Sequence, residues 1–303
     1  MKRENSLAVI ITVYNAAKFI HRTIKSVLSQ DYPFIEMIVV DDGSTDETVG
    51  LVKTFANHVR LLHHPQCINL GAAASRNLGI LSTNTRYIAF LDHDDIWYPN
   101  KVNEQIKVFE RHPEVGLVYT NGHAIDENDN ILNDLLPKDF CEPCNPDAML
   151  LSCYIQSPSS VILRRNLIEE IGMFDTNLKT ASDHDLWIRA SERTRLFYLP
   201  KYLFGYRKSP QQMSKCRKMW ETGFYILEKA RKRYPYSLTV RRKRKAVLHY
   251  RLGIHDLINR RIGSFLKNIF LAFIHDPWRS IRISQSKLLS QIRHNKSVVH
   301  NLL

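Results

Sequence analysis

Residues 35–47 read IEMIVVDDGSTDE, a buried strand that runs into an acidic turn and then into the start of a helix. The mostly apolar, β-branched stretch Ile35–Val40 is typical of a strand covered on both faces. Ser44 is followed three residues later by Glu47, which is the spacing of a capping box and predicts a helix from Ser44 through Phe55. A buried strand followed within a few residues by a helix is the unit from which α/β folds are built.

The same alternation of strands and helices continues along residues 7–206. The apolar pattern predicts strands over residues 7–13, 35–40, 59–62, 87–91, 115–119, 161–163 and 196–206. Apolar residues at helical spacing predict helices over residues 16–30, 44–55, 72–81, 101–111, 166–171 and 181–192. This order predicts a mostly parallel sheet with helices on both faces. Ligands bind such sheets beyond the carboxyl ends of the strands.

Charge is divided unevenly between two parts of the chain. The 303 residues carry a net charge of +13, with 44% apolar residues, which excludes a disordered or fibrous protein. Residues 1–205 hold 20 Lys and Arg against 26 Asp and Glu, whereas residues 206–303 hold 23 against 4. We therefore expect an α/β domain over residues 1–210 and a basic, mainly helical region over residues 211–303.

The basic region has two interpretations. Arg231–Arg233 and Arg241–Lys245 are basic runs, and apolar residues recur at helical spacing from Ile254 to Phe273. Basic and apolar faces together are typical of a segment that lies on an anionic membrane surface. A helical subdomain that packs its apolar stripe on the α/β domain explains the pattern equally well. No nucleic-acid-binding motif accompanies the charge, so we expect no nucleic acid partner.

The sequence predicts neither a membrane span nor a disulfide framework. No run approaches 18 uninterrupted apolar residues, and the stretch Leu7–Ile11 after Lys2-Arg3 is too short for a signal peptide. Cys141 and Cys144 have the spacing of a metal knuckle, but zinc requires a second pair of ligands. We expect a reduced loop there and a cytoplasmic protein, peripheral on the inner face of the cell membrane if the basic region binds lipid.

Two acidic clusters follow predicted strands. Asp41-Asp42 comes directly after residues 35–40, and Asp92-His93-Asp94-Asp95 comes directly after residues 87–91. Adjacent carboxylates are costly at a strand end unless they are solvated or bind something. Carboxylates accept hydrogen bonds from a base N–H or a ribose hydroxyl, and an Asp-x-Asp pair supplies part of a Mg²⁺ site that substrate phosphates complete. Taken singly, each cluster also fits a solvated or capping turn.

Two further motifs lie at predicted helix starts. Small residues open the helix after Gly71, and Arg76 is placed one turn inside it, where it can reach an anionic group. Asp183 and Asp185 both lie at the start of the helix over residues 181–192. One of these acids can serve as a general base, and the other can cap the helix or pair with Arg189.

Together these motifs resemble those of the family 2 glycosyltransferases, which have the GT-A fold and make bacterial surface polysaccharides of the cell envelope. The resemblance covers roughly residues 6–207. The motifs occur in the order Val13-Tyr14-Asn15, Asp41-Asp42-Gly43-Ser44, Asn69-x-Gly71, Leu91-Asp92-x-Asp94-Asp95-x-Trp97-x-Pro99 and Asp183-x-Asp185-Leu186-Trp187-x-Arg189.

The resemblance implies a fold, a reaction and a set of residue roles. It implies a Rossmann-like, mostly parallel mixed sheet flanked by helices, and an inverting hexosyl- or N-acetylhexosaminyltransferase. The donor would be a nucleotide-diphosphate sugar, chiefly a UDP-sugar, the cofactor Mn²⁺ or Mg²⁺, and the acceptor a glycan or a lipid-linked glycan. The matching positions are Asp183 for the catalytic base, Asp94 for the metal, and Val13, Tyr14, Asn15, Asp41 or Asp42, Arg76 and Asp92 for the nucleotide sugar.

The chain departs from the family pattern in three places. Thr12 stands where the first motif usually has proline, and Ser182 stands where the residue before the base is usually Glu. Residues 211–214 read QQMS and do not supply the Gln-x-x-Arg-Trp motif of processive synthases. This favours the transfer of one sugar per encounter over polymerisation.

Two other functions compete with this interpretation. A nucleotidyltransferase also joins paired acids to an α/β sheet, but it needs a glycine-rich loop with Arg or Lys after the first strand. The sequence there is Tyr14-Asn15-Ala16-Ala17. The other competing function is a non-catalytic protein that binds a sugar nucleotide or a polyanion, and release of free UDP from a donor distinguishes it from an enzyme.

Overall fold

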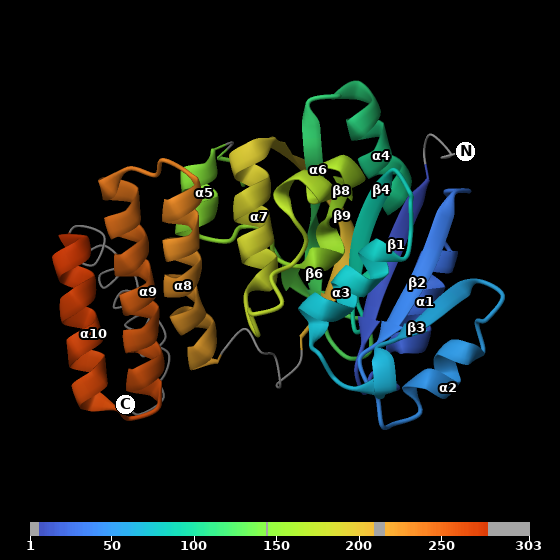
Figure 1. Ribbon diagram of the computed structural model, residues 1–303, viewed down its shortest axis with the longest axis horizontal. Helices are drawn as coiled ribbons and strands as arrows, with labels where there is room; N and C mark the ends of the chain where they lie inside the picture. Colours follow the sequence, from blue (N-terminus) through green and yellow to red (C-terminus); the bar gives the residue numbers. More distant parts are fainter. Residues whose placement is uncertain (1–5, 144, 209–215, 278–303) are drawn as a thin grey trace, which may run out of the picture. The chain divides into compact units, whose positions relative to one another are not determined.

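The computed structural model describes residues 6–143, 145–208 and 216–277 of the chain. The chain divides into two compact units, residues 1–212 and residues 213–303, called the N-terminal and C-terminal units below. Figure 1 shows the elements of each unit. Lys2-Arg3, Cys144 and residues 211–214 lie outside the described residues.

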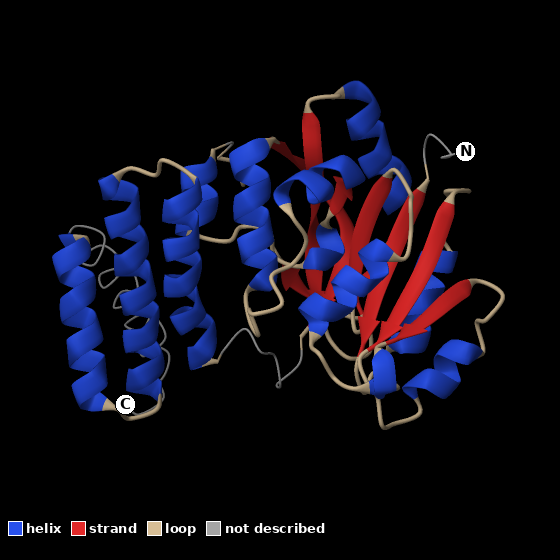
Figure 2. Ribbon diagram, viewed as in Figure 1, coloured by secondary structure: helices blue, strands red, loops and turns tan. Residues whose placement is uncertain are grey.

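One mixed sheet of nine strands organises the described part of the N-terminal unit (Figure 2). The strands are β1 (Leu7–Val13), β2 (Ile35–Asp41), β3 (Val59–His63), β4 (Tyr87–Asp92), β5 (Ile96–Trp97), β6 (Val115–Ile125), β7 (Ile131–Asp134), β8 (Ile162–Arg164) and β9 (Arg195–Arg207). Their order is β3, β2, β1, β4, β8, β6, β9 and β5, and β7 pairs with β6. β1 to β4 are parallel, whereas β8 runs antiparallel to β4.

Helices cover both faces of this sheet. They are α1 (Ile20–Leu28), α2 (Thr48–Lys53), α3 (Ala72–Leu81), α4 (Lys101–Arg111), α5 (Pro146–Leu151), α6 (Arg165–Ile171) and α7 (Ser182–Arg193). Side chains of a strand alternate between its two faces. Val9 and Ile11 of β1 therefore pack in one apolar cluster with Ile24 of α1 and Ile106 of α4, whereas Ile10 faces α3. The expected α/β fold and its mixed sheet are confirmed.

The sequence prediction placed two helix starts too early and missed short elements. α1 begins at Ile20 rather than at residue 16. α2 begins at Thr48 rather than at Ser44, and Glu47 makes no side-chain cap bond. The amide of Asn15 donates instead to Ser44 Oγ at 3.0 Å, so the expected capping residue ties the loop after β2 to the loop after β1. β5, β7 and α5 were not predicted, because two to six residues carry too little periodicity.

The described part of the C-terminal unit consists of three consecutive helices. They are α8 (Arg217–Arg233), α9 (Leu238–Ile258) and α10 (Ile262–His275), and α9 packs against the other two. Asp256 is fully buried among them, where it accepts a hydrogen bond from Ser264 at 2.6 Å and pairs with Arg217. In the described ranges of both units, no helix has the length and the apolar character needed to cross a membrane.

The close approach of α3 to β1 predicts opposite effects at two helical glycines. A Cβ atom added at Gly79 of α3 would lie 2.5 Å from Ile10 Cγ2, whereas one added at Gly50 of α2 would have nothing within 4 Å. Overpacking a core costs about 1–3 kcal/mol, and replacing a helical glycine by alanine gains about 1 kcal/mol. We expect Gly79→Ala to lower the melting temperature of the protein and Gly50→Ala to leave it unchanged or raise it, as measured by scanning fluorimetry. Equal melting temperatures for both variants would contradict this packing.

Candidate active site

Acidic residues end the two strands on either side of β1. Asp41 of β2 is level with Val13, and Asp92 of β4 is level with Thr12. Neighbouring strands lie about 4.8 Å apart, so these two carboxylates flank the end of β1. The carboxyl edge of the sheet therefore gathers residues that are about fifty positions apart in the sequence.

The loop after β1 is tied to the loop after β2. Asn15 has a left-handed backbone (φ 49°), and its side-chain oxygen accepts from the amide of Thr45 at 2.9 Å. Ala16 donates its amide to Thr48 Oγ1 at 2.7 Å. The side chain of Val13 packs in the core, whereas that of Tyr14 is 47% exposed. Of the three residues expected to bind the nucleotide sugar here, Val13 is buried, whereas Tyr14 and Asn15 are exposed.

Asp41 and Asp42 each organise a loop. Asp41 accepts from the amide of Ser44 at 3.2 Å and lies 3.3 Å from Nδ1 of His63. Asp42 accepts from the amides of Leu70 at 2.8 Å and Gly71 at 2.9 Å, which are the residues just before α3. Both carboxylates are buried. The acidic pair therefore shapes the rim of the site, and its contact with a nucleotide stays a prediction.

Arg76 of α3 reaches the turn that follows β4. Its Nη2 donates to Asp92 Oδ1 at 2.8 Å, and its guanidinium lies 5.3 Å from the ring centre of Phe174. Both the arginine and its partner are largely buried, which makes this ion pair stronger than one at the surface. The anionic group that Arg76 reaches in this structure is therefore the side chain of Asp92. Its contact with a nucleotide sugar stays a prediction.

Asp94 is partly exposed in the same turn. Burial raises the pKa of its carboxyl, His93 and Arg207 oppose that rise, and the charge of Asp92 adds to it. Two carboxylates that repel each other in this way favour a bound cation. In the described ranges no group of three or more His, Cys, Asp or Glu side chains can hold a metal ion. The donor set fits a partial site for Mg²⁺ or Mn²⁺ that substrate phosphates would complete.

Asp95 is fully buried and holds the turn in place. Its Oδ2 accepts from the hydroxyl of Ser159 at 2.6 Å, and its Oδ1 accepts from the amide of Arg207 at 3.0 Å. Ser159 Oγ in turn accepts from the amide of Asp92 at 3.0 Å. The guanidinium of Arg207 donates to the carbonyl of Asp94 at 2.7 Å. The carboxyl of Asp95 is therefore structural, whereas that of Asp92 pairs with Arg76 and that of Asp94 is partly exposed.

Asp183 lies in the first turn of α7, and Asp185 has a different task. Asp185 is buried and pairs with Arg189 at 3.0 Å, which was one of the two roles expected for it. Asp183 is partly exposed and accepts from the amide of His184 at 2.8 Å. Burial raises the pKa of Asp183, the charge of Arg76 lowers it, and the charge of Asp92 raises it again. Asp183 therefore lies within the electric fields of Arg76 and Asp92.

Tyr206 of β9 connects the two halves of the site. Burial raises the pKa of its hydroxyl, and the negative charges of Asp95, Asp92, Asp94 and Asp183 raise it further. The hydroxyl of Tyr206 thus interacts electrostatically with the carboxylates of the turn after β4 and with the carboxylate of Asp183 in α7. The structure brings Arg76, Asp92, Asp94 and Asp183 into one region, with Asp41, Asp42, Tyr14 and Asn15 along the same sheet edge.

Sequence reasoning missed three residues that build this region: Tyr206, Arg207 and Ser159. Each lies more than 60 positions from the Asp92–Asp95 turn and belongs to none of the recognised motifs. The one available signal was an arginine at the end of a strand, because a charged residue there needs a partner. Arg207 is 1% exposed and also binds the loop over residues 126–129.

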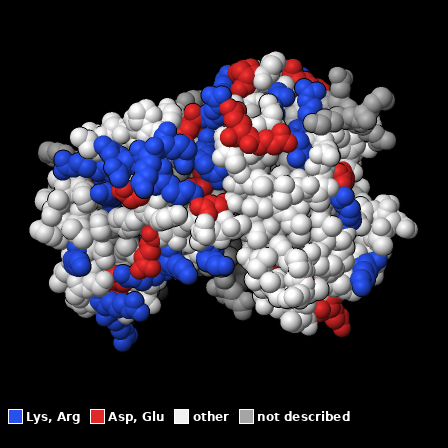
Figure 3. Space-filling view, in the orientation of Figure 1, with Lys and Arg blue, Asp and Glu red and all other residues white. Residues whose placement is uncertain are grey.

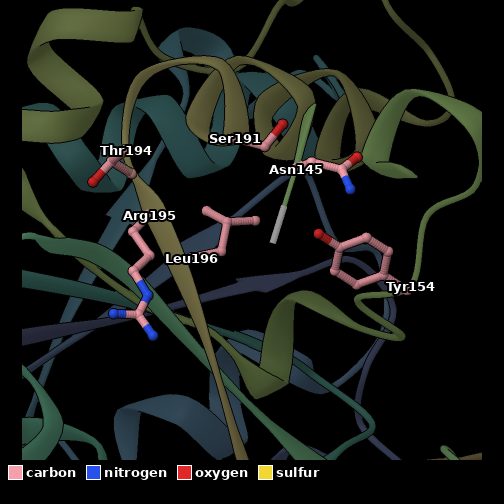
Figure 4. Close-up of a pocket in the computed structure, with 6 residues that line it drawn as sticks. All are labelled: Asn145, Tyr154, Ser191, Thr194, Arg195 and Leu196. Atoms are coloured by element: carbon pink, nitrogen blue, oxygen red, sulfur yellow. The ribbon is translucent and has the colours of Figure 1, made fainter. Parts of the chain in front are cut away.

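A separate pocket lies at the opposite end of α7. Figure 4 shows the residues that line it, which are Asn145, Tyr154, Ser191, Thr194, Arg195 and Leu196. Ser191 belongs to the last turn of α7, whereas Asp183 belongs to its first. A helix of this length spans about 18 Å, so the pocket is not part of the acidic region.

Comparison with known sequences identifies the family. A family model described as glycosyl transferase family 2 matches residues 8–172, more than half of the chain. An uncharacterized glycosyltransferase of Rickettsia prowazekii (strain Madrid E) is 30% identical over 196 residues, covering 63% of this chain and 60% of that protein. One of Rickettsia bellii (strain RML369-C) is 28% identical over 71% of this chain. The chain spans about one third to three fifths of the length of these relatives.

One relative has a named reaction. The chain is 34% identical over 185 residues to the Escherichia coli UDP-Glc:alpha-D-GlcNAc-diphosphoundecaprenol beta-1,3-glucosyltransferase WfaP. The alignment covers 60% of this chain and 68% of WfaP.

Solved structures show the same fold at low sequence identity. Staphylococcus aureus TarS 1–349 in complex with UDP-GlcNAc aligns with a TM-score of 0.65 and 20% identity, over 91% of this chain and 82% of that one. The mannosyltransferase PcManGT from Pyrobaculum calidifontis, in complex with GDP-Man and Mn²⁺, aligns with a TM-score of 0.62 and 18% identity, over 93% and 79%. The sheet thus has the GT-A arrangement, and the match over residues 8–172 shows that the chain is a glycosyltransferase of family 2.

Proposed function

We propose that this glycosyltransferase transfers one sugar, with inversion, from a UDP-sugar to a hydroxyl of a glycan or of a lipid-linked glycan, in the cytoplasm. The observation that carries the proposal is the position of Asp183 within the fields of Arg76 and Asp92. A base on α7 and a phosphate-binding turn after β4 would then lie on opposite sides of the reacting carbon. We assign this reaction to residues 1–210.

Asp183 would act as the general base. Its carboxylate takes the proton from the acceptor hydroxyl while that oxygen attacks the anomeric carbon from the face opposite the diphosphate. A free aspartate is a weak base toward an alcohol, and burial raises the pKa of Asp183, which makes it a stronger base. Ser182, in place of the usual Glu, adds no second negative charge beside it.

The nucleotide and the leaving diphosphate would bind along the carboxyl edge of the sheet. Tyr14 offers an exposed ring near the end of β1, and Asp41 or Asp42 offers an acceptor for the base or the ribose. Asp94, with Asp92 beside it, would hold Mn²⁺ or Mg²⁺, and the cation offsets the charge that develops on the diphosphate. Arg76 keeps the Asp92 carboxylate in place through their 2.8 Å contact.

The proteins that resemble this chain support the proposed donor, a UDP-sugar, and the proposed lipid-linked acceptor to different degrees. WfaP is named for a UDP-Glc donor and TarS was solved with UDP-GlcNAc, whereas PcManGT was solved with GDP-Man and Mn²⁺. The name of WfaP also includes a lipid-linked acceptor. The direct test is a panel of UDP-, GDP- and dTDP-sugars with Mn²⁺ or Mg²⁺, scored for release of the nucleotide. Release from UDP-sugars alone is the expected result, and release from none of the donors would overturn the proposal.

Removal of the proposed base is expected to stop transfer without weakening donor binding. Asp183→Asn keeps the size of the side chain and removes its basicity, so turnover should fall by about 10²–10⁴-fold. Calorimetric affinity for UDP should stay close to that of the wild type. Asp147→Asn is a matched control, because Asp147 also lies in the first turn of a helix, α5. Wild-type turnover in Asp183→Asn would refute the assignment of the base.

The metal role of Asp94 predicts a defect that depends on the cation. Asp94→Asn should weaken UDP binding in the presence of Mn²⁺ by about tenfold or more, because even groups that only orient a metal ligand contribute about 10–100-fold. Binding measured with EDTA should be similar for the variant and the wild type. Asp139→Asn, at an exposed turn, is the control. An unchanged affinity with Mn²⁺ would contradict this role.

The charge environment of Asp183 predicts the direction of a pH shift. Activity needs the ionised base, so kcat/KM is lost as the pH falls through the pKa of Asp183, and this acid limb should lie above about 3.9, the pKa of a free aspartate. Arg76→Gln removes the positive charge that lowers this pKa, so the limb should move to higher pH. Arg111→Gln, an exposed residue of α4, should leave the limb in place. A shift to lower pH in Arg76→Gln would contradict the proposed geometry.

A further inference from the structure

α10 combines a buried polar side chain with a large exposed apolar surface, which is unusual for a helix on a globular protein. Its two buried side chains in the described structure are Asn268 and Ala272. Asn268 donates to Asp256 Oδ2 at 3.2 Å, and Ser264 donates to the same oxygen at 2.6 Å. Asn268 Oδ1 also lies 3.0 Å from Nδ1 of His249. Ser264 and Asn268 of α10 thus contact α9, and Ile269 packs close to Gly253 of the same helix.

Five large apolar side chains of α10 are exposed to solvent. They are between 44% and 64% exposed in the described structure, and they are Ile262, Leu266, Phe270, Phe273 and Ile274. Their spacing of three or four residues places them on one stripe of the helix. Leu257 and Ile258 extend the exposed apolar surface at the end of α9. We call these seven residues the apolar stripe, and a contiguous exposed surface of this kind marks a site of interaction.

Positive charge surrounds the apolar stripe. Residues 216–277 contain 15 Lys and Arg against 4 Asp and Glu. Arg260 and Arg261 directly precede Ile262, and Arg242 donates to the carbonyl of Ile274 at 3.1 Å at the other end of α10. Figure 3 shows the Lys and Arg side chains gathered in a band over the upper parts of α8 and α9. An apolar stripe with arginines at both ends fits a surface that is apolar inside and negatively charged outside.

We propose that the C-terminal unit docks on an anionic lipid surface, with α10 lying in the plane of the interface. The apolar stripe would enter the boundary between headgroups and acyl chains, and the flanking arginines would contact the anionic headgroups. The 14 residues of α10 span about 21 Å, which is too short to cross about 30 Å of hydrocarbon. A second copy of the chain is the weaker occupant, because two strongly basic surfaces repel each other.

The proposal predicts two separable contributions to binding. Each Lys or Arg near an anionic surface should add about fivefold to the partition coefficient, and added salt should screen this part. The apolar contribution should persist in salt and depend on the stripe. Neither the electrostatic nor the apolar contribution involves the residues assigned to sugar transfer. Membrane binding can therefore be tested independently of the proposed reaction.

The test is cosedimentation of the full chain with vesicles of phosphatidylcholine alone and of phosphatidylcholine with 30% phosphatidylglycerol. The wild type should bind the anionic vesicles, and 0.5 M salt should weaken that binding. Leu266→Ser with Phe270→Ser should lower the partition coefficient by tenfold or more. Leu81→Ser is the matched control, because Leu81 of α3 is 70% exposed and lies outside the stripe. Release of the nucleotide from a soluble donor should be equal in all three proteins, which excludes unfolding as the cause.

Three results would overturn the proposal. The first is a wild type that does not bind anionic vesicles. The second is a double variant that binds as tightly as the wild type. The third is a wild type that is dimeric in light scattering without vesicles and that Leu266→Ser with Phe270→Ser makes monomeric, which would assign the stripe to a second copy of the chain.

Discussion

The buried carboxylate of Asp95 is the interaction on which the rest of the acidic region depends. A carboxylate without solvent is stable in a fold only when hydrogen bonds surround it. Ser157, Ser159 and the amide of Arg207 supply those bonds. Two segments that lie far from this turn in the sequence, residues 157–159 and the end of β9, are thereby fastened to it. The side chains of Asp92 and Asp94 can then point toward a ligand, because the hydrogen bonds of Asp95 fix the turn that carries them.

Burial and bonding to protein donors also separate the acids of this region into two groups. Asp42 and Asp185 are buried and bound by donors of the protein, backbone amides in one case and Arg189 in the other. Asp94 and Asp183 are partly exposed, and burial raises the pKa of each. The motifs therefore contain both buried carboxylates that hold the fold, those of Asp42 and Asp185, and partly exposed carboxylates, those of Asp94 and Asp183.

Local sequence patterns predicted the α/β order of elements and most of the strands, because buried β-branched runs such as residues 7–13 have few alternative structures. The spacing of Asp185 and Arg189 likewise indicated their ion pair. The pattern at Ser44 was misleading, because a tertiary partner, the amide of Asn15, took the hydroxyl that a cap would have used. Tyr206 and Arg207 could not be found, because their role exists only once β9 lies beside β6.

The exposed apolar stripe of α10 has a consequence for which amino-acid substitutions this helix can accept. In most helices of globular proteins, the apolar positions are those that the requirement to fold keeps constant. In α10 that requirement falls on Ser264 and Asn268, which complete the buried cluster around Asp256. Under the proposed docking, substitutions in the apolar stripe would change binding to a lipid surface, while Ser264 and Asn268 would still complete the cluster around Asp256. The fold of the C-terminal unit and the proposed contact with lipid would then depend on different residues of one short helix.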